Sequence, residues 1–143
     1  MEVIQQRHAA LSIVAQASEL RRAATWLQSA AGARGVPDAD IARLDMCLHE
    51  AVANIIDHGG LPADAAVRLE LEVGDGAATL TLIDGGTPFD PVDAPAPKRP
   101  ATLEETLPGG LGLVMIRSQA DTLNYRYEGG CNELALTVHW TSL

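Results

Sequence analysis

Apolar residues recur every three or four positions in two stretches of the chain, which is the spacing of a helix buried on one side. The first stretch predicts a helix from Ser18, as its N-cap, to about Ala31. The second predicts a helix capped by Asp38 and ended by the glycines and proline of residues 59–62. The apolar stripe of this second helix consists of Leu44, Leu48, Ala51 and Ile55.

Elsewhere apolar and polar residues alternate, as in strands with one buried face. The alternating segments are residues 2–14, 67–73, 79–83, 123–127 and 134–140. Short Gly-containing turns join the second segment to the third and the fourth to the fifth, so each pair predicts an antiparallel hairpin.

Residues 90–108 carry five prolines and predict a long loop, because proline fits neither a sheet interior nor a regular helix. A Gly-rich turn then opens a helix that runs to about Ala120. The element order is β-α-α-β-β-loop-α-β-β. It predicts an α+β fold, a two-layer sandwich with helices on one face of a mixed, mostly antiparallel sheet.

The length of 143 residues predicts one domain over residues 1–143. The net charge of −9 argues against a general nucleic-acid surface, which needs clustered Lys and Arg. No apolar run reaches membrane-spanning length, and no signal-peptide pattern is seen. Cys47 and Cys131 are too few and too isolated for a disulfide framework or a zinc site, so we expect a cytoplasmic protein.

On the second predicted helix, Glu50, Asn54 and His58 are spaced four apart and share one face. A carboxamide oxygen is a hard ligand suited to Mg²⁺, and a nearby carboxylate can accept a proton from a hydroxyl or a water. The alternative is a solvated polar face without chemistry. A zinc-protease motif at His49 is excluded, because Ala53 stands where the second His is needed.

A second candidate begins where the strand of residues 79–83 ends in Asp84, followed by a turn that contains Gly86. A buried Asp at a strand end can accept a hydrogen bond from an exocyclic amine such as that of adenine. The glycine would let the backbone approach the ring closely. The alternative is an ordinary Asp-Gly turn.

A third candidate is the Gly-Gly-Leu-Gly-Leu run at 109–113, before a predicted helix. Free N–H groups at a helix N-terminus bind phosphates. The alternative is a flexible hinge and cap. A P-loop is excluded because no Lys-Ser or Lys-Thr follows, and a dinucleotide fold is excluded because the βαβ context is missing.

In this order and spacing, the three candidates resemble the three nucleotide-binding boxes of the GHKL, or histidine-kinase-like, ATPase superfamily. The resemblance covers about residues 10–140. Within the superfamily, Glu-Ala-Val-Ala-Asn at 50–54 and Pro-Phe-Asp-Pro at 88–91 are most similar to the bacterial anti-sigma-factor serine/threonine kinases of partner-switching systems.

The resemblance implies a role for each residue of the first two boxes. Glu50 would be the general base, and Asn54 would hold Mg²⁺ on the nucleotide phosphates. Asp84 would read the adenine amine, with Gly86 beside the ring. Pro88 stands where many superfamily members have glycine, a substitution usual in the kinase subgroup.

The remaining nucleotide contacts would come from the lid and the third box. Residues 90–108 would form the ATP lid, whose Lys98 and Arg99 could meet the γ-phosphate; the alternative is that they only solubilise the loop. The third box would contact the phosphates through Gly109, Gly110, Leu111, Gly112 and Leu113. Family members often place a Thr early in the last strand. Asn132 occupies that region here and Thr137 lies later, so neither is given a role, and His58 is interpreted as a helix-end residue.

The implied function is an ATP- and Mg²⁺-dependent serine kinase that phosphorylates a STAS-domain anti-sigma-factor antagonist. When not engaged by this antagonist, it would sequester a sigma factor or an equivalent output protein. A homodimer is implied by the resemblance alone. The alternatives are a non-catalytic ATP-binding module that switches partners and a detached histidine-kinase catalytic domain.

Overall fold

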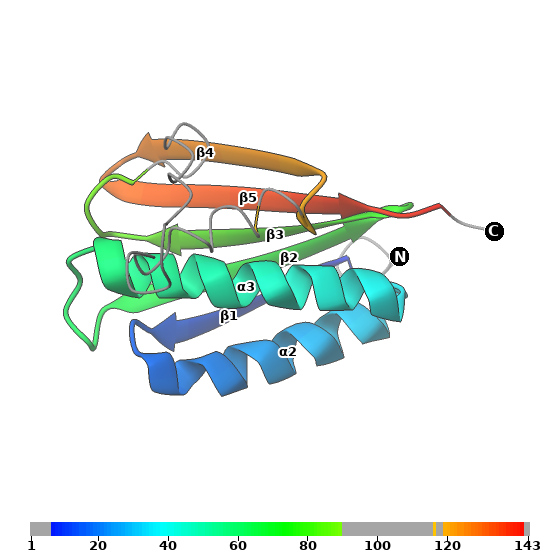
Figure 1. The fold of residues 1–143 in the computed structure, drawn as a ribbon, viewed down its shortest axis with the longest axis horizontal. Coiled ribbons are helices and arrows are strands. Elements are labelled where there is room, and N and C mark those ends of the chain that lie inside the picture. The colour runs from blue at the N-terminus through cyan, green and yellow to red at the C-terminus, as the bar shows by residue number, and fades with distance from the viewer. Residues whose placement is uncertain (1–6, 90–115, 117–118, 142–143) are drawn as a thin grey trace, which may run out of the picture.

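The computed structural model describes residues 7–89, 116 and 119–141. Within this part the chain forms five strands, two α-helices and one 3₁₀ turn (Figure 1). In chain order these are β1 (His8–Val14), η1 (Ala17–Glu19), α2 (Leu20–Ala33), α3 (Asp38–His58), β2 (Ala66–Gly74), β3 (Ala77–Asp84), β4 (Thr122–Glu128) and β5 (Cys131–His139).

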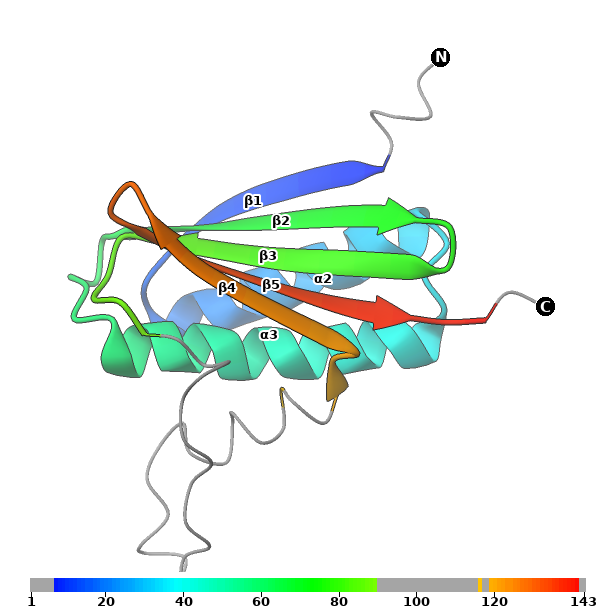
Figure 2. The same cartoon turned by 90° about the horizontal axis from the view of Figure 1, so that it is seen from above.

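The five strands form one sheet in the order β1-β2-β3-β5-β4, and all four pairings are antiparallel. Both helices lie side by side on the same face, as Figures 1 and 2 show. Helix α2 contacts β1 and β2, whereas α3 contacts β3 and β5. The predicted two-layer α+β fold is confirmed.

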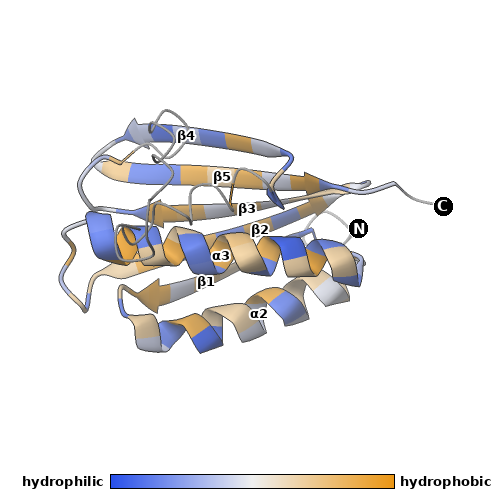
Figure 3. Ribbon diagram, viewed as in Figure 1, coloured by the Kyte–Doolittle hydropathy of each residue, from blue (hydrophilic) through white to orange (hydrophobic). Residues whose placement is uncertain are grey.

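The core lies between the helices and the sheet. Alternate strand residues point into it, which gives the strands the banded hydropathy seen in Figure 3. The predicted helix stripe packs there too: Leu44 and Leu48 are fully buried, Ala51 nearly so, and Ile55 borders the core. Both cysteines are free, and burial raises the pKa of the Cys47 thiol to about 11.

Two predicted helix caps are wrong. Ser18 lies within η1 and its hydroxyl is 3.4 Å from Gln16 Oε1, so α2 begins at Leu20 without a side-chain cap. Asp38 is the first residue of α3 rather than its cap, because Pro37 holds the extended cap conformation and its carbonyl accepts the first helical N–H groups. The carboxylate of Asp38 still favours this helix end through the helix dipole.

Several predicted boundaries shift slightly. The first strand begins at His8, α2 continues two residues past Ala31, and Trp140 follows β5. The loop predicted at 90–108 and the start of the next helix lie outside the described residues. Ile116, near the predicted end of that helix, is fully buried in the core. Neither helix of the described part is long and apolar enough to cross a membrane.

Arg43 ties the N-terminal half of α3 to the start of β4. Its guanidinium donates to Asp40 Oδ1 and to the Gln119 carbonyl at 3.0 Å each, and lies 3.0 Å from Asp121 Oδ2. A longer bond of 3.4 Å reaches the His139 carbonyl. Burial opposes the charge, but the bonds to Asp121 and Asp40 outweigh it and leave the pKa of Arg43 raised. This end of α3 is therefore held by satisfied polar contacts.

Candidate functional site

A cavity lies at the C-terminal end of α3, where that helix meets the end of β3 and the start of β5. Its lining is largely apolar, with a few polar groups that converge on it, as in most ligand sites. The lining residues are Ala51, Asn54, Ile55, Gly59, Leu82, Asp84, Thr87, Phe89, Tyr125, Asn132 and Leu134.

Asn54 is buried against this cavity, with 6% of its surface exposed, so it is not part of a solvated polar face. Its Oδ1 atom is buried and accepts no hydrogen bond from the described part of the chain. Two other buried polar atoms share this condition, in Arg34 and Asp45, but neither residue lines the cavity. A buried oxygen without a partner is costly, and at a cavity it is suited to bind a ligand or a cation.

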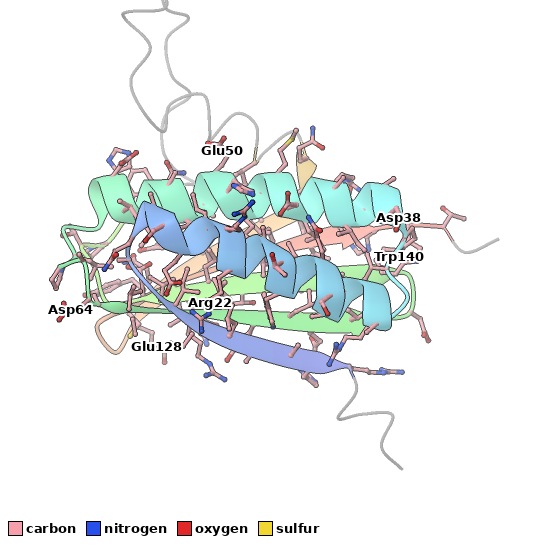
Figure 4. The ribbon with its side chains drawn as sticks, turned by 90° about the horizontal axis from the view of Figure 1, so that it is seen from below. Arg22, Asp38, Glu50, Asp64, Glu128 and Trp140 are labelled. Atoms are coloured by element: carbon pink, nitrogen blue, oxygen red, sulfur yellow. The ribbon has the colours of Figure 1, made fainter. Side chains whose placement is uncertain are left out.

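Glu50 lies one turn before Asn54 on α3 and is half-buried. The two Cβ atoms of such a pair are about 5–6 Å apart. Figure 4 shows Glu50 on the side of α3 that points away from α2. Its carboxylate is outside the cavity lining and forms no ion pair with another described residue. It therefore lies on α3 as a partly exposed carboxylate, one turn before a residue that lines the cavity.

His58 is the last residue of α3 and is exposed. Its ring stacks on that of Phe89, with centroids 4.8 Å apart and an interplanar angle of 15°. This agrees with its interpretation as a helix-end residue. The stack joins the end of α3 to the segment that follows β3.

Asp84 is the last residue of β3 and is buried, as predicted. Its Oδ1 accepts hydrogen bonds from the backbone N–H of Gly86 at 2.9 Å and from Asn132 Nδ2 at 3.1 Å. Its Oδ2 accepts none from residues that the structure describes. Within the described residues, one carboxylate oxygen is thus fixed by two donors and the other has no donor.

Gly86 packs directly against Gly59 at the end of α3. A Cβ at Gly86 would stand 2.6 Å from the Gly59 carbonyl oxygen and 2.9 Å from Asp84 Oδ1. The Thr87 N–H donates to the same Gly59 carbonyl at 2.9 Å. The glycine is therefore required by backbone packing, a reason that the sequence did not reveal. Pro88 is exposed and does not line the cavity.

Asn54 and Asp84 both line the cavity, whereas Gly86 contacts Asp84 without lining it, and Glu50 lies one turn before Asn54 on α3. The predicted lid and third-box residues lie outside the described part of the chain. They are Lys98, Arg99, Gly109, Gly110, Leu111, Gly112 and Leu113.

Sequence reasoning missed Asn132. It is buried, faces Asp84 across the β3–β5 pairing and donates to that carboxylate. Tyr125, noted only as a strand residue, donates from its hydroxyl to Asn132 Oδ1. Thr137 bonds to Thr79 at 2.8 Å instead and takes no part in the cavity. The available signal was the position of Asn132, early in the last strand where family members often have Thr.

The residues present fit a magnesium nucleotide. No cluster of three or more His, Cys, Asp or Glu that could hold a metal alone occurs among residues 7–89, 116 and 119–141. Mg²⁺ needs no such cage, because it keeps waters and is bound by one or two protein oxygens together with substrate phosphates. Oδ1 of Asn54 is one suitable oxygen, and Oδ2 of Asp84 suits an amine donor, since neither atom accepts a hydrogen bond from residues 7–89, 116 or 119–141.

The sequence and fold are similar to those of known proteins. The chain is 35% identical to the serine/threonine-protein kinase BtrW of Bordetella bronchiseptica over 97 residues, which is 67% of this chain and 68% of BtrW. Its fold matches a chain of the SiaB–SiaC complex from Pseudomonas aeruginosa with a TM-score of 0.70 and 17% identity, covering 94% of this chain and 91% of that chain.

The fold also matches the crystal structure of the RsbU and RsbW domains of Rv1364c from Mycobacterium tuberculosis. The TM-score is 0.64 at 18% identity, and the match covers 92% of this chain but only 32% of that chain, so this chain spans about a third of its length. The family model of the histidine kinase-like ATPase domain matches residues 13–138. The chain therefore belongs to the histidine kinase-like ATPase family.

Proposed function

We propose that this chain is an ATP-dependent protein serine kinase of a partner-switching system. The observation that carries the proposal is the pairing of Glu50 with Asn54 on α3. The Asn54 oxygen is buried with no partner in the described part of the chain, at the cavity that Asp84 also lines. In this proposal, Asn54 is the metal ligand, Glu50 the base and Asp84 the amine acceptor.

The cavity residues bind the nucleotide in this proposal. Asp84 accepts from the adenine amine through its free oxygen, and Asn54 supplies an oxygen to Mg²⁺. The apolar lining, with Ile55 and Leu82, covers the purine ring. When bound, Mg²⁺-ATP supplies the transferable phosphoryl group and neutralises its charge, and the protein contributes mainly by positioning. Lys98, Arg99 and residues 109–113 complete the phosphate contacts.

Glu50 takes the proton from the acceptor hydroxyl. A half-buried carboxylate at the edge of the cavity remains accessible to a side chain of another protein. A serine hydroxyl is a weak nucleophile, so a base within hydrogen-bond reach accelerates its attack.

The acceptor we propose is a serine of a STAS-domain anti-sigma-factor antagonist. Support comes from BtrW, which is named a serine/threonine-protein kinase, and from the shared fold of chains in the SiaB–SiaC and RsbU–RsbW structures. The chain would act as a homodimer in the cytoplasm. When not bound to the antagonist, it would sequester a sigma factor or an equivalent output protein.

The test is phosphorylation of a STAS-domain antagonist encoded in the same genome, followed with radiolabelled ATP. Glu50→Gln should slow transfer by about 10²–10⁴-fold, because the base is lost while the shape of the side chain is kept. ATP affinity should stay near that of the wild type. Glu72→Gln, on the exposed and helix-free face of the sheet, is the matched control and should transfer at the wild-type rate.

Equal transfer rates in the two variants would remove the base assignment. ATP binding by the wild type without transfer to any such antagonist would make the chain a non-catalytic switch module. Transfer to a histidine on another protein, recognised by an acid-labile phosphate, would make it a detached histidine-kinase domain.

A further inference from the structure

The side chain of Asn132 is the centre of a hydrogen-bond network at the cavity. Its Nδ2 lies 3.1 Å from each of three acceptors: Asp84 Oδ1 and the carbonyl oxygens of Gly86 and Thr87. Its Oδ1 accepts from the backbone N–H of Phe89 at 3.2 Å and from the hydroxyl of Tyr125. One buried carboxamide thus joins the end of β3 to the whole segment from Gly86 to Phe89.

The orientation of this carboxamide is determined by its neighbours. The Phe89 N–H can only donate, so it requires the oxygen of Asn132 on its side. The Asp84 carboxylate and the two carbonyls can only accept, so they require the nitrogen. The flipped carboxamide would place a donor against the Phe89 N–H and an acceptor against the carboxylate and both carbonyls. In the observed orientation the Tyr125 hydroxyl is a second donor to the Asn132 oxygen.

The sheet places these groups together. Strand β5 runs between β3 and β4, and Asn132 is directly opposite Asp84 on one side. On the other side Tyr125 is opposite Leu134, two residues further along β5, and so reaches Asn132 diagonally. The edge strand β4 is thereby connected to the carboxylate at the end of β3.

We propose that Asn132, oriented by Tyr125, is a positioning residue that sets the preference of this site for 6-aminopurine nucleotides. The inference rests on the nucleotide site proposed above. Two donors on its Oδ1 hold the Asp84 carboxylate in one orientation, and its Oδ2, which has no donor among the described residues, is the acceptor for the nucleotide. A 6-amino group satisfies that acceptor. A purine with hydrogen at C6 leaves this acceptor without a donor. A purine with oxygen at C6 places a second acceptor against it.

Loss of the Asn132 hydrogen bonds should weaken one contact of the nucleotide, the one between Asp84 and the 6-amino group. Without the Asn132 donor, Asp84 keeps one hydrogen bond and gains freedom to rotate, so the contact to the 6-amino group weakens. Contacts to the rest of the purine and to the phosphates persist. The ratio of affinities for nucleotides that differ only at C6 therefore reports on Asn132, whereas a general loss of packing lowers both affinities alike.

The experiment measures dissociation constants for Mg²⁺-ATP, the triphosphate of purine riboside and ITP by calorimetry. The wild type should prefer ATP to the purine riboside nucleotide by about tenfold or more, the value of one hydrogen bond to a charged group. Tyr125→Phe should reduce this ratio about threefold, and Asn132→Ala should bring it near one. Neither variant should change the affinity for the purine riboside nucleotide more than about twofold.

Tyr127→Phe is the matched control, because Tyr127 lies on the same strand, opposite Asn132 in register, and is 46% exposed. It should keep the wild-type ratio. Thermal melting shows which variants are folded, and Tyr125→Phe, which removes one oxygen atom, tests the proposal even where Asn132→Ala does not fold.

Three results overturn the inference. If both variants keep the wild-type ratio while all affinities fall together, Asn132 is only structural. If the wild type does not distinguish ATP from the purine riboside nucleotide, Asp84 does not read the 6-amino group although the nucleotide site stands. If the wild type binds none of the nucleotides, the proposed function itself is wrong and the inference falls with it.

Discussion

The two ends of α3 pack on the same sheet but differ in how their polar groups are satisfied. Near the N-terminal end, Arg43 contacts two carboxylates and two backbone carbonyls. Near the C-terminal end, the buried Oδ1 of Asn54 accepts no hydrogen bond from a described residue, and neither does Oδ2 of Asp84 beside it. One helix thus carries a guanidinium with four acceptors near one end and, near the other, a buried amide oxygen that accepts no hydrogen bond from the described residues.

This difference separates stability from binding. The contacts of Arg43 hold α3 to the segment before β4. Their loss leaves the buried Asp40 without its partner. A buried oxygen without a partner costs stability, and at a cavity a ligand can offset that cost. Both lie on α3, whose packing on β3 and β5 positions the binding groups independently of the contacts that Arg43 makes.

The largest effect that we expect from this difference is on nucleotide binding. Asn54→Ala should lower the affinity for Mg²⁺-ATP by about 100-fold, or about 2.7 kcal/mol, since a metal ligand is lost. The free energy of unfolding without nucleotide should change by less than about 1 kcal/mol, because the oxygen removed has no partner and alanine favours helix. Calorimetry with and without Mg²⁺ and urea unfolding measure the two quantities.

Arg43→Ala is the opposite control. It should cost about 2 kcal/mol of stability, since it leaves the buried Asp40 unpaired, and the folded protein should bind ATP within about twofold of the wild type. If Asn54→Ala instead destabilised the chain as much as Arg43→Ala and left binding intact, the two ends of α3 would not differ in kind.

A smaller effect is expected where the turn after β3 packs against the backbone at the C-terminal end of α3. Gly86→Ala would place a Cβ 2.6 Å from the Gly59 carbonyl oxygen, so the turn after β3 must move away from α3. We expect a loss of about 1–3 kcal/mol in the free energy of unfolding and weaker ATP binding, because Asp84 moves with the turn.

Gly85→Ala is the matched control for this substitution. The nearest atom to its added Cβ is the Gly130 carbonyl oxygen at 4.0 Å, so stability and ATP affinity should remain near those of the wild type. Equal losses in the two variants, measured by urea unfolding, would show that the contact with Gly59 has no special importance.

Local patterns predicted most of the fold. The periodicity of α3 and the short turns of both hairpins are determined by neighbouring residues, so Leu48 and the strand of residues 67–73 were predicted in their observed places. The caps at Ser18 and Asp38 were wrong, because a 3₁₀ turn and a proline at position 37 took the capping positions. Ser and Asp are common at helix N-caps, but also in turns and in the first turn of a helix. Their presence alone therefore does not show which of these positions they occupy.

The candidate site was predictable only in part, because its contacts join distant segments. Asn54 and Asp84 are marked by their own positions on predicted elements. Asn132 meets Asp84 through the pairing of β3 with β5, whose register is set across 46 intervening residues rather than by a turn. The contact between Gly59 and Gly86 likewise depends on how α3 docks on the sheet, which no local pattern specifies.

The smallest expected effect is on the free energy of unfolding and depends on pH. It concerns Asp121, which contacts Arg43 near the N-terminal end of α3. The backbone N–H of His139 and then the Arg43 guanidinium stabilise the Asp121 carboxylate and lower its pKa. A lowered pKa in the folded state means that this stabilisation is present above the unfolded value of about 4 and is lost as the pH falls through the lower folded value.

Asp121→Asn should therefore reduce the free energy of unfolding at pH 7 by less than about 1 kcal/mol, since 40% of the side chain is exposed and solvent screens the charge. The difference from the wild type should shrink below about pH 4 and in high salt, as urea unfolding at pH 7 and pH 3 would measure. Asp64→Asn, at an exposed position that Figure 4 shows at the opposite end of the molecule from Asp38, should show no such trend. A deficit of Asp121→Asn that stayed constant from pH 7 to pH 3 would mean that the amide disturbs packing. The carboxylate charge would then contribute nothing to the cluster around Arg43.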